Sequence, residues 1–463
     1  MRTKLLKITA FGGMGLLMLI LIAATITETV YGSSFALSNI YHSAWFITLW
    51  SVLAVSAMIY IMRVSRRGTL ILLHTSFAVT LLGAFVSFMT SQHGNIVLTK
   101  DSVPASMFTT TEGTLEKLPF QLQLTEIDTF YIEGTEQANG YKACITAEDK
   151  TGSSTHAVSL NSPMKNNGYS FCIKGVSDNG LSLLVARDTY GKPISYMGYL
   201  MIFASFIMLF FDKRSGFRHI LQQLQETKKT KENSPRGNFV GKVGLILAIP
   251  FILLCFIWYK RGIFPASNGA ESLFLLAFAM TMLAVFFKTK KIFKSLRRIL
   301  LTVAGIITVV AAFSFEWDSS VQPILRTPLL GIHVTTIIIA YALLFCTAIN
   351  AVMALCSKDS KKRTKLALLG RALLYPATTF LAAGIFIGAV WANISWGRYW
   401  GWDPKEVWAL ITLLVCSTAF HTHSLRFISK PTTFHIFCLV AFTAMLFTFF
   451  GVNYLLGGIH SYA

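Results

Sequence analysis

Residues 69–90 read Thr69-Leu-Ile-Leu-Leu-His-Thr-Ser-Phe-Ala-Val-Thr-Leu-Leu-Gly-Ala-Phe-Val-Ser-Phe-Met-Thr90, without one charged side chain. A helix needs about 20 apolar residues to cross the hydrocarbon core of a bilayer, and this run is long enough. Ten further runs of this kind are found at 6–26, 44–62, 194–212, 241–259, 270–288, 299–316, 329–355, 372–392, 404–425 and 433–456. The sequence therefore predicts an all-α polytopic membrane protein with about eleven transmembrane helices.

The composition of the whole chain agrees with a membrane protein. Of the 463 residues, 54% are hydrophobic and only 13% are charged, roughly half the usual charged share of about 25%. Phenylalanine alone contributes 37 residues. A water-soluble protein could not bury so much apolar surface, and a disordered chain would not contain it, so both classes are excluded.

The net charge of +20 could suggest nucleic-acid binding, but the position of the basic residues argues against it. With the N-terminus in the cytoplasm, the cytoplasmic segments hold 28 of the 41 Lys and Arg and four of the 21 acids. These segments are 1–7, 63–67, 212–242, 288–298, 356–371 and 426–430. Basic loops mark the cytoplasmic side of membrane proteins, so we expect a bacterial inner-membrane protein that binds no nucleic acid. Lys260-Arg261, on the outer side, is the one local exception.

The chain divides into successive segments. Residues 1–90 supply three helices, and 91–193 form a small exported domain between helices three and four, with strand-like alternation such as Phe120-Gln-Leu-Gln-Leu124. A fourth helix (194–212) and a charged cytoplasmic linker (213–240) follow, and 241–463 hold seven helices. Cys144 and Cys172 share the exported domain and either form a disulfide or remain two thiols.

Residues 391–408 carry the segment that indicates chemistry. Five of the nine tryptophans fall here: Trp391, Trp396, Trp400, Trp402 and Trp408. Asp403-Pro-Lys-Glu406 has the pattern of a helix start, so we assign Asp403 and Glu406 to a cap rather than to acid–base catalysis. The helix cap does not account for the indoles, which accompany Asn393 and Arg398 in a Gly-containing loop. Such a set of side chains suits a flat amphiphilic ligand with carboxylates, such as a porphyrin.

Four of the ten histidines lie at two depths of the expected bilayer. His74 and His421 are seven and five residues from Arg67 and Arg426, close to the cytoplasmic face. His333 and His460 lie at outer helix ends, near the tryptophan-rich segment. Because a six-coordinate haem iron takes two axial ligands, these histidines are candidates in two pairs. The rival candidates are His423, His435 and His93, whereas His42, His156 and His219 are expected to be solvated.

The sequence also resembles a known family. Trp396-Gly-Arg-Tyr-Trp-Gly-Trp-Asp-Pro-Lys-Glu-Val-Trp408 is similar to the "WWD" signature of haem-handling proteins, and Gly331-Ile-His-Val and Asn453-Tyr-Leu-Leu-Gly-Gly-Ile-His resemble CcsA (ResC). Leu72-Leu-His-Thr-Ser-Phe and Asn161-Ser-Pro-Met resemble CcsB (ResB). Together they indicate a fused CcsB–CcsA, the System II cytochrome c synthase, with an exported domain shorter than the usual one.

This resemblance implies a mechanism. Haem b, as substrate and bound ligand, enters from the cytoplasm to His74 and His421 and passes outward to His333 and His460. Trp396, Trp400, Trp402 and Asp403 belong to the site of attachment, and the loop indoles stack on the macrocycle. Arg398 either pairs a propionate or is an interfacial residue whose charge reaches the membrane surface. The partners are an apocytochrome c with Cys-x-x-Cys-His, which receives thioether bonds, and a thiol-reducing protein; the exported domain and the WWD loop are periplasmic. The alternatives are a haem exporter without covalent ligation and a b-type electron-transfer subunit.

Overall fold

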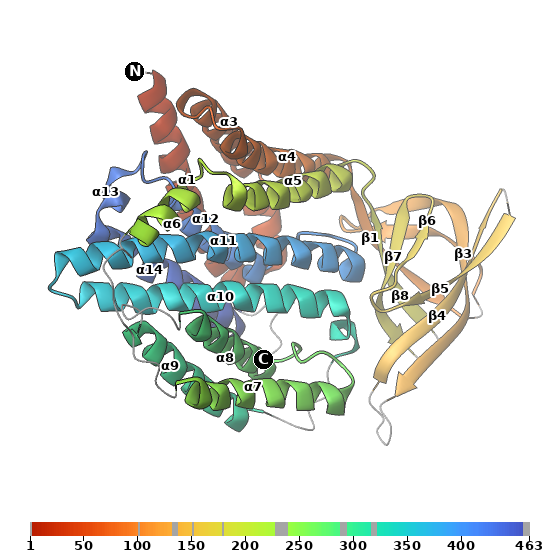
Figure 1. Cartoon of the computed structure of the whole chain (residues 1–463). Coiled ribbons are helices and arrows are strands. Elements are labelled where there is room, and N and C mark those ends of the chain that lie inside the picture. Colours follow the sequence, from red (N-terminus) through yellow and green to blue (C-terminus); the bar gives the residue numbers. More distant parts are fainter. Residues whose placement is uncertain are drawn as a thin grey trace.

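The computed structural model describes residues 2–100, 102–131, 138–150, 152–177, 180–226, 239–287, 294–315 and 322–456. An antiparallel sheet lies at one end of a helical bundle, and the α10–α11 connection lies at the other (Figure 1). The N-terminal helices are α1 (Arg2–Tyr31), α2 (Ser33–Ala36), η1 (Leu37–Tyr41), α3 (Ala44–Val64), α4 (Gly68–Thr90), α5 (Gly191–Phe211) and α6 (Gly216–Glu226). The C-terminal helices are α7 (Phe239–Arg261), α8 (Gly269–Phe286), α9 (Lys294–Phe313), η4 (Pro323–Leu325), α10 (Pro328–Leu355), α11 (Ser360–Trp396), α12 (Pro404–Thr418), α13 (Arg426–Ser429), α14 (Pro431–Leu446) and η5 (Phe447–Leu456).

Nine helices in the described part of the chain are long and apolar enough to cross a membrane. They occupy nine of the eleven expected positions, and the other two positions hold α7 and α12. At 15 residues, α12 is about 22 Å long, too short to cross a hydrocarbon core of about 30 Å by itself. The expected helix over 404–425 was therefore wrong at its C-terminal end, since α12 stops at Thr418.

Two other expected boundaries also differ from the structure. α11 begins at Ser360, so the basic segment 356–371 is mostly helix and not a connecting loop. The expected linker 213–240 contains α6. This helix packs on α11, where the ring centroids of Phe217 and Tyr375 lie 5.5 Å apart. Residues 227–238, in the rest of this linker, lie outside the described residues.

Eight strands form one antiparallel sheet between α4 and α5. They are β1 (Gln92–Thr99), β2 (Ala105–Thr110), β3 (Leu115–Tyr131), β4 (Ala138–Asp149), β5 (Gly152–Ser159), β6 (Met164–Asn166), β7 (Tyr169–Ser177) and β8 (Gly180–Arg187). The strand order is β5-β4-β3-β2-β1-β8-β7-β6, and the bridge between Ser159 and Ser162 brings the two edges close together. The sheet is thus nearly closed into a barrel, whose interior is filled by apolar side chains such as Leu122, Ile145 and Phe171. The predicted exported β structure is confirmed as a β fold.

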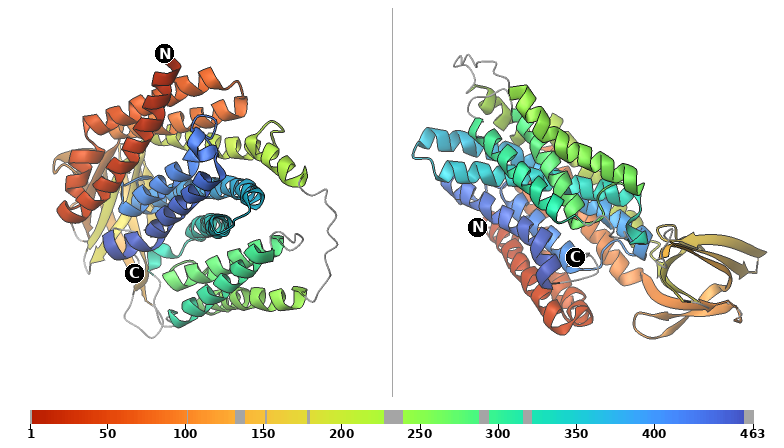
Figure 2. Two further views of the ribbon diagram at one scale, coloured as in Figure 1. Left: turned by 90° about the vertical axis from the view of Figure 1, so that its left-hand side faces the viewer. Right: turned by 90° about the horizontal axis from the view of Figure 1, so that it is seen from below.

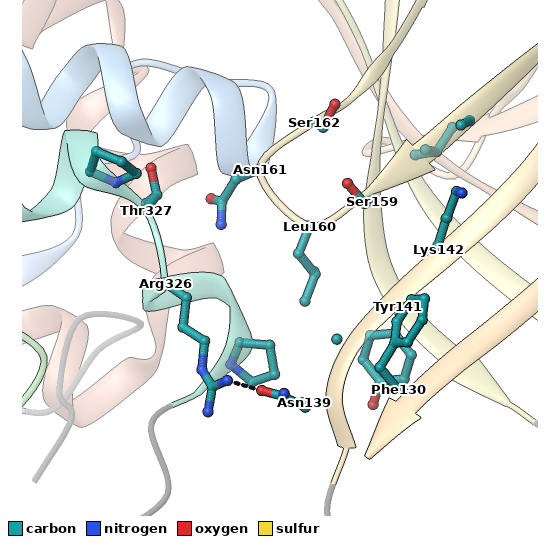
Figure 3. Close-up of a pocket in the computed structure, with 15 residues that line it drawn as sticks. Phe130, Asn139, Tyr141, Lys142, Ser159, Leu160, Asn161, Ser162, Arg326 and Thr327 are labelled. Atoms are coloured by element: carbon teal, nitrogen blue, oxygen red, sulfur yellow. Dashed lines mark hydrogen bonds between the residues drawn. The ribbon is translucent and has the colours of Figure 1, made fainter. Parts of the chain in front are cut away.

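The barrel contacts the helical bundle through polar groups. The Asn161 side chain donates to the carbonyl of Ile324 at 2.8 Å and accepts from Ser395 Oγ at 2.6 Å. Arg326 donates to the side-chain oxygen of Asn139, beside a cavity of about 540 Å³ between the barrel and the segment before α10 (Figure 3). These contacts place the barrel directly against the C-terminal end of α11.

The two halves of the chain share one bundle. In the C-terminal half, α10 packs between α8, α11 and α14, and its buried face includes Ala340 and Ala348. From the N-terminal half, α1 packs on α12, and Leu21 of α1 and Phe46 of α3 belong to the same buried apolar cluster as Ile411 (Figure 2). The C-terminal half therefore carries part of its core on helices of the N-terminal half.

Arg261, which belongs to the basic pair on the expected outer side, has an acidic partner within the protein. Arg261 Nη1 lies 2.8 Å from Glu271 Oε1, and the Glu271 side chain is fully buried. The second carboxylate oxygen accepts from the backbone N–H and the hydroxyl of Ser267, both at 2.7 Å. Because the Arg261 charge is neutralised within the protein, it does not oppose the charge distribution expected for the outer side.

Candidate functional site

The tryptophan-rich segment contains a much shorter loop than expected. α11 continues through Trp396 and ends at Gly397, which has the left-handed conformation (φ +72°) common after helix C-termini. α12 begins at Pro404, so the loop comprises residues 397–403. Trp391 and Trp396 lie on α11 and Trp408 lies on α12, so the loop within 391–408 is limited to residues 397–403.

The start of α12 has the expected cap. Asp403 accepts a hydrogen bond from the backbone N–H of Lys405 at 2.9 Å. Glu406 Oε2 accepts from the backbone N–H of Asp403 at 3.2 Å and from that of Gly401 at 2.8 Å. The two carboxylates thus complete a capping box, and Glu406 also folds the loop back onto the helix.

Two of the five indoles already have aromatic neighbours that occupy a ring face. Trp402 stacks on Tyr41 of η1, with ring centroids 4.6 Å apart and planes inclined by 11°. Trp408 packs against Phe447 at 4.0 Å, and its Nε1 donates to Thr25 of α1 at 3.2 Å. Trp402 also has a positive φ of 59°, unusual for a residue with a large side chain. These two tryptophans therefore hold the segment against the N-terminal helices.

The other indoles are arranged differently. Trp391 is 3% exposed, and its ring meets that of Trp396 edge to face, with centroids 4.9 Å apart. The rings of Trp400 and Trp402 are also edge to face, with centroids 5.8 Å apart. Nε1 of Trp391 and Nε1 of Trp400 are buried and have no hydrogen-bond partner among the described residues. A buried N–H without an acceptor is costly, so both groups suit a ligand that supplies one.

The two polar candidates of the segment lie on either side of the α11 terminus. Asn393 is half-buried on the last turn of α11. Arg398 is exposed, and its guanidinium packs over Gly401, where a Cβ atom would lie 3.1 Å from Cζ. Burial, together with the nearby charge of Arg398, lowers the pKa of His93 on β1.

His333 lies in a niche between α10 and α11. Its Nδ1 donates to the carbonyl of Gly384 at 2.7 Å, and Gly388 leaves room for the ring. A backbone carbonyl on Nδ1 fixes the orientation of the ring and the tautomer in which Nε2 is the ligating nitrogen. His460, its expected partner, lies outside the described residues.

His74 and His421, distant in sequence, are brought together by the fold. Their ring centroids lie 6.0 Å apart with perpendicular planes. Nδ1 of His74 donates to the carbonyl of Leu70 at 2.8 Å, and Nδ1 of His421 donates to that of Ser417 at 3.0 Å. Two imidazoles on opposite sides of one metal are separated by roughly 6 Å between centroids, because each metal–nitrogen bond is about 2 Å long. The separation of the His74 and His421 rings therefore matches that of two imidazoles that ligate one metal ion.

The position of His421 also corrects an expectation. His421 was expected on a helix, but α12 ends three residues earlier, so His421 lies in the following turn. Phe11 of α1 packs against its ring at 5.2 Å, and Tyr60 of α3 is hydrogen-bonded to Ser424 at 2.7 Å. These contacts were not predicted, because no periodic pattern identifies residues that support a turn.

The remaining histidines are dispersed. His435 is fully buried on α14, with Nε2 at 3.3 Å from the carbonyl of Arg363. His423 follows His421 in the turn after α12, and His42 contacts Phe88 at 5.2 Å. His156 lies on β5 and His219 on α6. Among the described residues, none of these rings packs against another histidine.

Cys144 and Cys172 are both free thiols. Cys144 lies on β4 and Cys172 on β7, where the Cys172 thiol donates to the carbonyl of Ile394 on α11 at 3.6 Å. Burial raises the pKa of the Cys172 thiol to about 11. Of the two alternatives, the structure contains two thiols, and Cys172 lies at the junction of barrel and bundle.

These features define a multi-pass membrane protein with one pair of histidines in contact, a further histidine niche and a short tryptophan-bearing loop clamped between two halves. Family models match both halves: "ResB-like family" over residues 63–195 and "Cytochrome C assembly protein" over residues 266–460. The chain belongs to the cytochrome c biogenesis proteins and is a fused ResB–CcsA member of them.

Individual relatives agree with this membership. Cytochrome c biogenesis protein CcsA of Chlamydomonas reinhardtii is 35% identical over 241 residues, which are 48% of this chain and 67% of that relative. The CcsA of Trieres chinensis is 30% identical over 272 residues, 48% of this chain and 86% of the relative. Protein NrfI of Wolinella succinogenes is 30% identical over 278 residues, 58% of this chain but 29% of the much longer relative. Cytochrome c biogenesis involves haem and an apocytochrome c.

Proposed function

We propose that this protein is a holocytochrome c synthase of the bacterial inner membrane, with the barrel and the tryptophan loop on the periplasmic side. Haem b binds first between His74 and His421. It then moves to the outer site, where His333 and His460 are its axial ligands. The observation that best supports this proposal is the contact of the His74 and His421 rings, each held through Nδ1 by a backbone carbonyl.

The outer site performs the attachment. Trp391, Trp396 and Trp400 cover the porphyrin, the unpartnered indole N–H groups and Arg398 face its polar edge, and Asn393 adds an amide. Each cysteine thiol of the apocytochrome Cys-x-x-Cys-His motif adds across one vinyl group. The sulfur bonds to the inner vinyl carbon and a proton is added to the outer carbon, so the addition is not a net oxidation or reduction. Both thiols must be reduced, which requires a thiol-reducing partner.

The test is expression with an apocytochrome c in a host without its own maturation system. We expect haem that remains attached to the cytochrome after denaturation, and a purified synthase with a six-coordinate haem spectrum. Substituting Ala for His74 and His421 should remove the inner haem, and substituting Ala for His333 and His460 should remove the outer one. His156→Ala on the barrel is the control and should change neither.

The outcomes separate the candidate functions. Haem in the periplasm without a covalent product would make the protein an exporter. A bound haem that exchanges electrons but yields neither product would indicate an electron-transfer subunit. An unchanged spectrum in both double variants would contradict the ligand assignment.

A further inference from the structure

A chain of hydroxyl groups connects the tryptophan loop to the N-terminal half. Tyr399 lies in the middle of the loop and is 8% exposed. Its hydroxyl donates to Ser87 Oγ at 2.8 Å and accepts from Ser195 Oγ at 3.0 Å. Ser87 Oγ in turn donates to Asp188 Oδ2 at 2.5 Å. Every donor in this chain points toward the Asp188 carboxylate, and hydrogen bonds to a charged acceptor are the stronger ones.

The four residues come from elements that are far apart in sequence. Ser87 is near the end of α4, Asp188 lies between β8 and α5, and Ser195 is on α5. Asp188 Oδ1 also accepts from the backbone N–H of Gly191 at 2.9 Å. The chain therefore joins the loop to the point where the barrel meets its two membrane helices.

Close packing of α4 on α5 fixes the serines. A Cβ atom at Gly191 would lie 2.1 Å from Ser87 Oγ, and one at Gly83 would lie 2.4 Å from Ser195 Oγ. Neither glycine could be replaced by a larger residue without displacing Ser87 or Ser195. The positions of the acceptor and donor for Tyr399 are thus fixed by the packing of α4 on α5. Burial raises the pKa of Tyr399, so its hydroxyl keeps its proton.

We propose that Tyr399 is a positioning residue of the outer haem site, through which the ResB-like half fixes the conformation of the tryptophan loop. The inference rests on the proposed function. Tyr399 neighbours Arg398 and Trp400, so rotation of the loop about this anchor would displace both groups that face the porphyrin. The hydroxyl acts through the loop and does not touch the reacting atoms.

The protein contains a second tyrosine that provides a matched control for Tyr399. Tyr196 lies on α5 with its ring centroid 6.4 Å from that of Tyr399, and its buried hydroxyl has no hydrogen-bond partner among the described residues. Tyr399→Phe and Tyr196→Phe remove the same atom from neighbouring rings. Only Tyr399→Phe breaks the series of hydrogen bonds that holds the loop.

The experiment titrates haem into the purified full-length chain that carries His74→Ala and His421→Ala, so that only the outer site is observed. Tyr399→Phe should weaken outer haem binding about tenfold and shift the spectrum of the bound haem, whereas Tyr196→Phe should bind as the background does. Ser195→Ala leaves the hydrogen bond from Tyr399 to Ser87 intact and should weaken outer haem binding about threefold. In the chain with all four histidines, the inner haem should be unaffected by Tyr399→Phe.

Each result decides the proposal. Equal outer affinity and spectra for Tyr399→Phe and Tyr196→Phe would overturn it, as would equal loss at the inner and outer sites, which would indicate general destabilisation. If Tyr399→Phe fails to fold, Ser195→Ala against Tyr196→Phe gives the same comparison. If the background chain binds no haem at the outer site, the proposed function fails and not this inference alone.

Discussion

A Cβ atom added at Gly388 would lie 2.5 Å from Cε1 of His333, and one at Gly384 would lie 2.5 Å from Ile337. Real Cβ atoms do not approach so closely, so both glycines of α11 are needed for α10 to lie where it does. The same contact lets the imidazole reach the Gly384 carbonyl. The position of a ligand is therefore set by the absence of side chains on the facing helix.

Gly388→Ala should push the His333 ring out of its niche and break its bond to the Gly384 carbonyl. We expect at least tenfold less covalent cytochrome product and a weakened outer haem spectrum, measured after co-expression and by haem titration. Gly305→Ala on α9 is the control, since a Cβ there meets nothing within 4 Å and should stabilise the helix by about 1 kcal/mol. Wild-type spectra and yield in Gly388→Ala would show that the niche is not needed.

At this scale the sequence predicted more about the inner histidines than about their surroundings. The depths of His74 and His421 followed from their distance to Arg67 and Arg426, and the fold brings the rings together. The support from Phe11 could not be predicted, because an apolar residue in a long apolar run carries no sign of the residue it meets. Tyr399 stood within the recognised motif, but its role depends on partners from three distant segments.

At the scale of one element, the start of α12 shows what Asp403 does. As the N-cap it accepts from backbone N–H groups of the first turn, including that of Lys405, and Asn is as good an N-cap as Asp. Asp403→Asn should therefore keep haem binding and attachment within about twofold, whereas Asp403→Ala should cost about 1 kcal/mol of stability. Yield of covalent cytochrome and thermal melting of each purified variant measure this. An Asp403→Asn protein that binds haem but cannot attach it would instead assign Asp403 to the chemistry.

Helix ends were harder to predict than helices. Apolar runs located the membrane-crossing part of α11, but the helix continues through basic residues from Ser360 and through Trp396, since helical hydrogen bonding does not stop at the membrane boundary. The end of α12 at Thr418 was missed because no Gly or Pro follows it closely. The strand around Phe120 was predicted correctly because alternation is a direct sign of a sheet with one buried face.

At the scale of the molecule, the two halves recognised by separate family models are interdependent. The ResB-like match ends at residue 195 and the cytochrome c assembly match begins at residue 266, yet the loop of the second half is held by the first. Tyr399 is hydrogen-bonded to Ser87 and Ser195 within the first match, and Trp402 stacks on Tyr41 in the segment before it. No sequence pattern could predict these contacts between the halves. A pattern shows which faces of a helix are apolar, but it does not show which faces pack together.

These contacts predict that covalent fusion of the halves is dispensable for the outer site. Chains 1–226 and 239–463, expressed together, should copurify through a tag on one of them and bind haem with the spectrum of the fused protein. Contacts across the interface would replace the linker, although the halves would lose the high effective concentration that the linker gives. Tyr41→Ala removes the ring under Trp402 and should reduce copurification severalfold, whereas His156→Ala should not. Halves that fail to copurify, while each remains soluble in detergent, would show that the linker and not the interface holds the tryptophan loop in place.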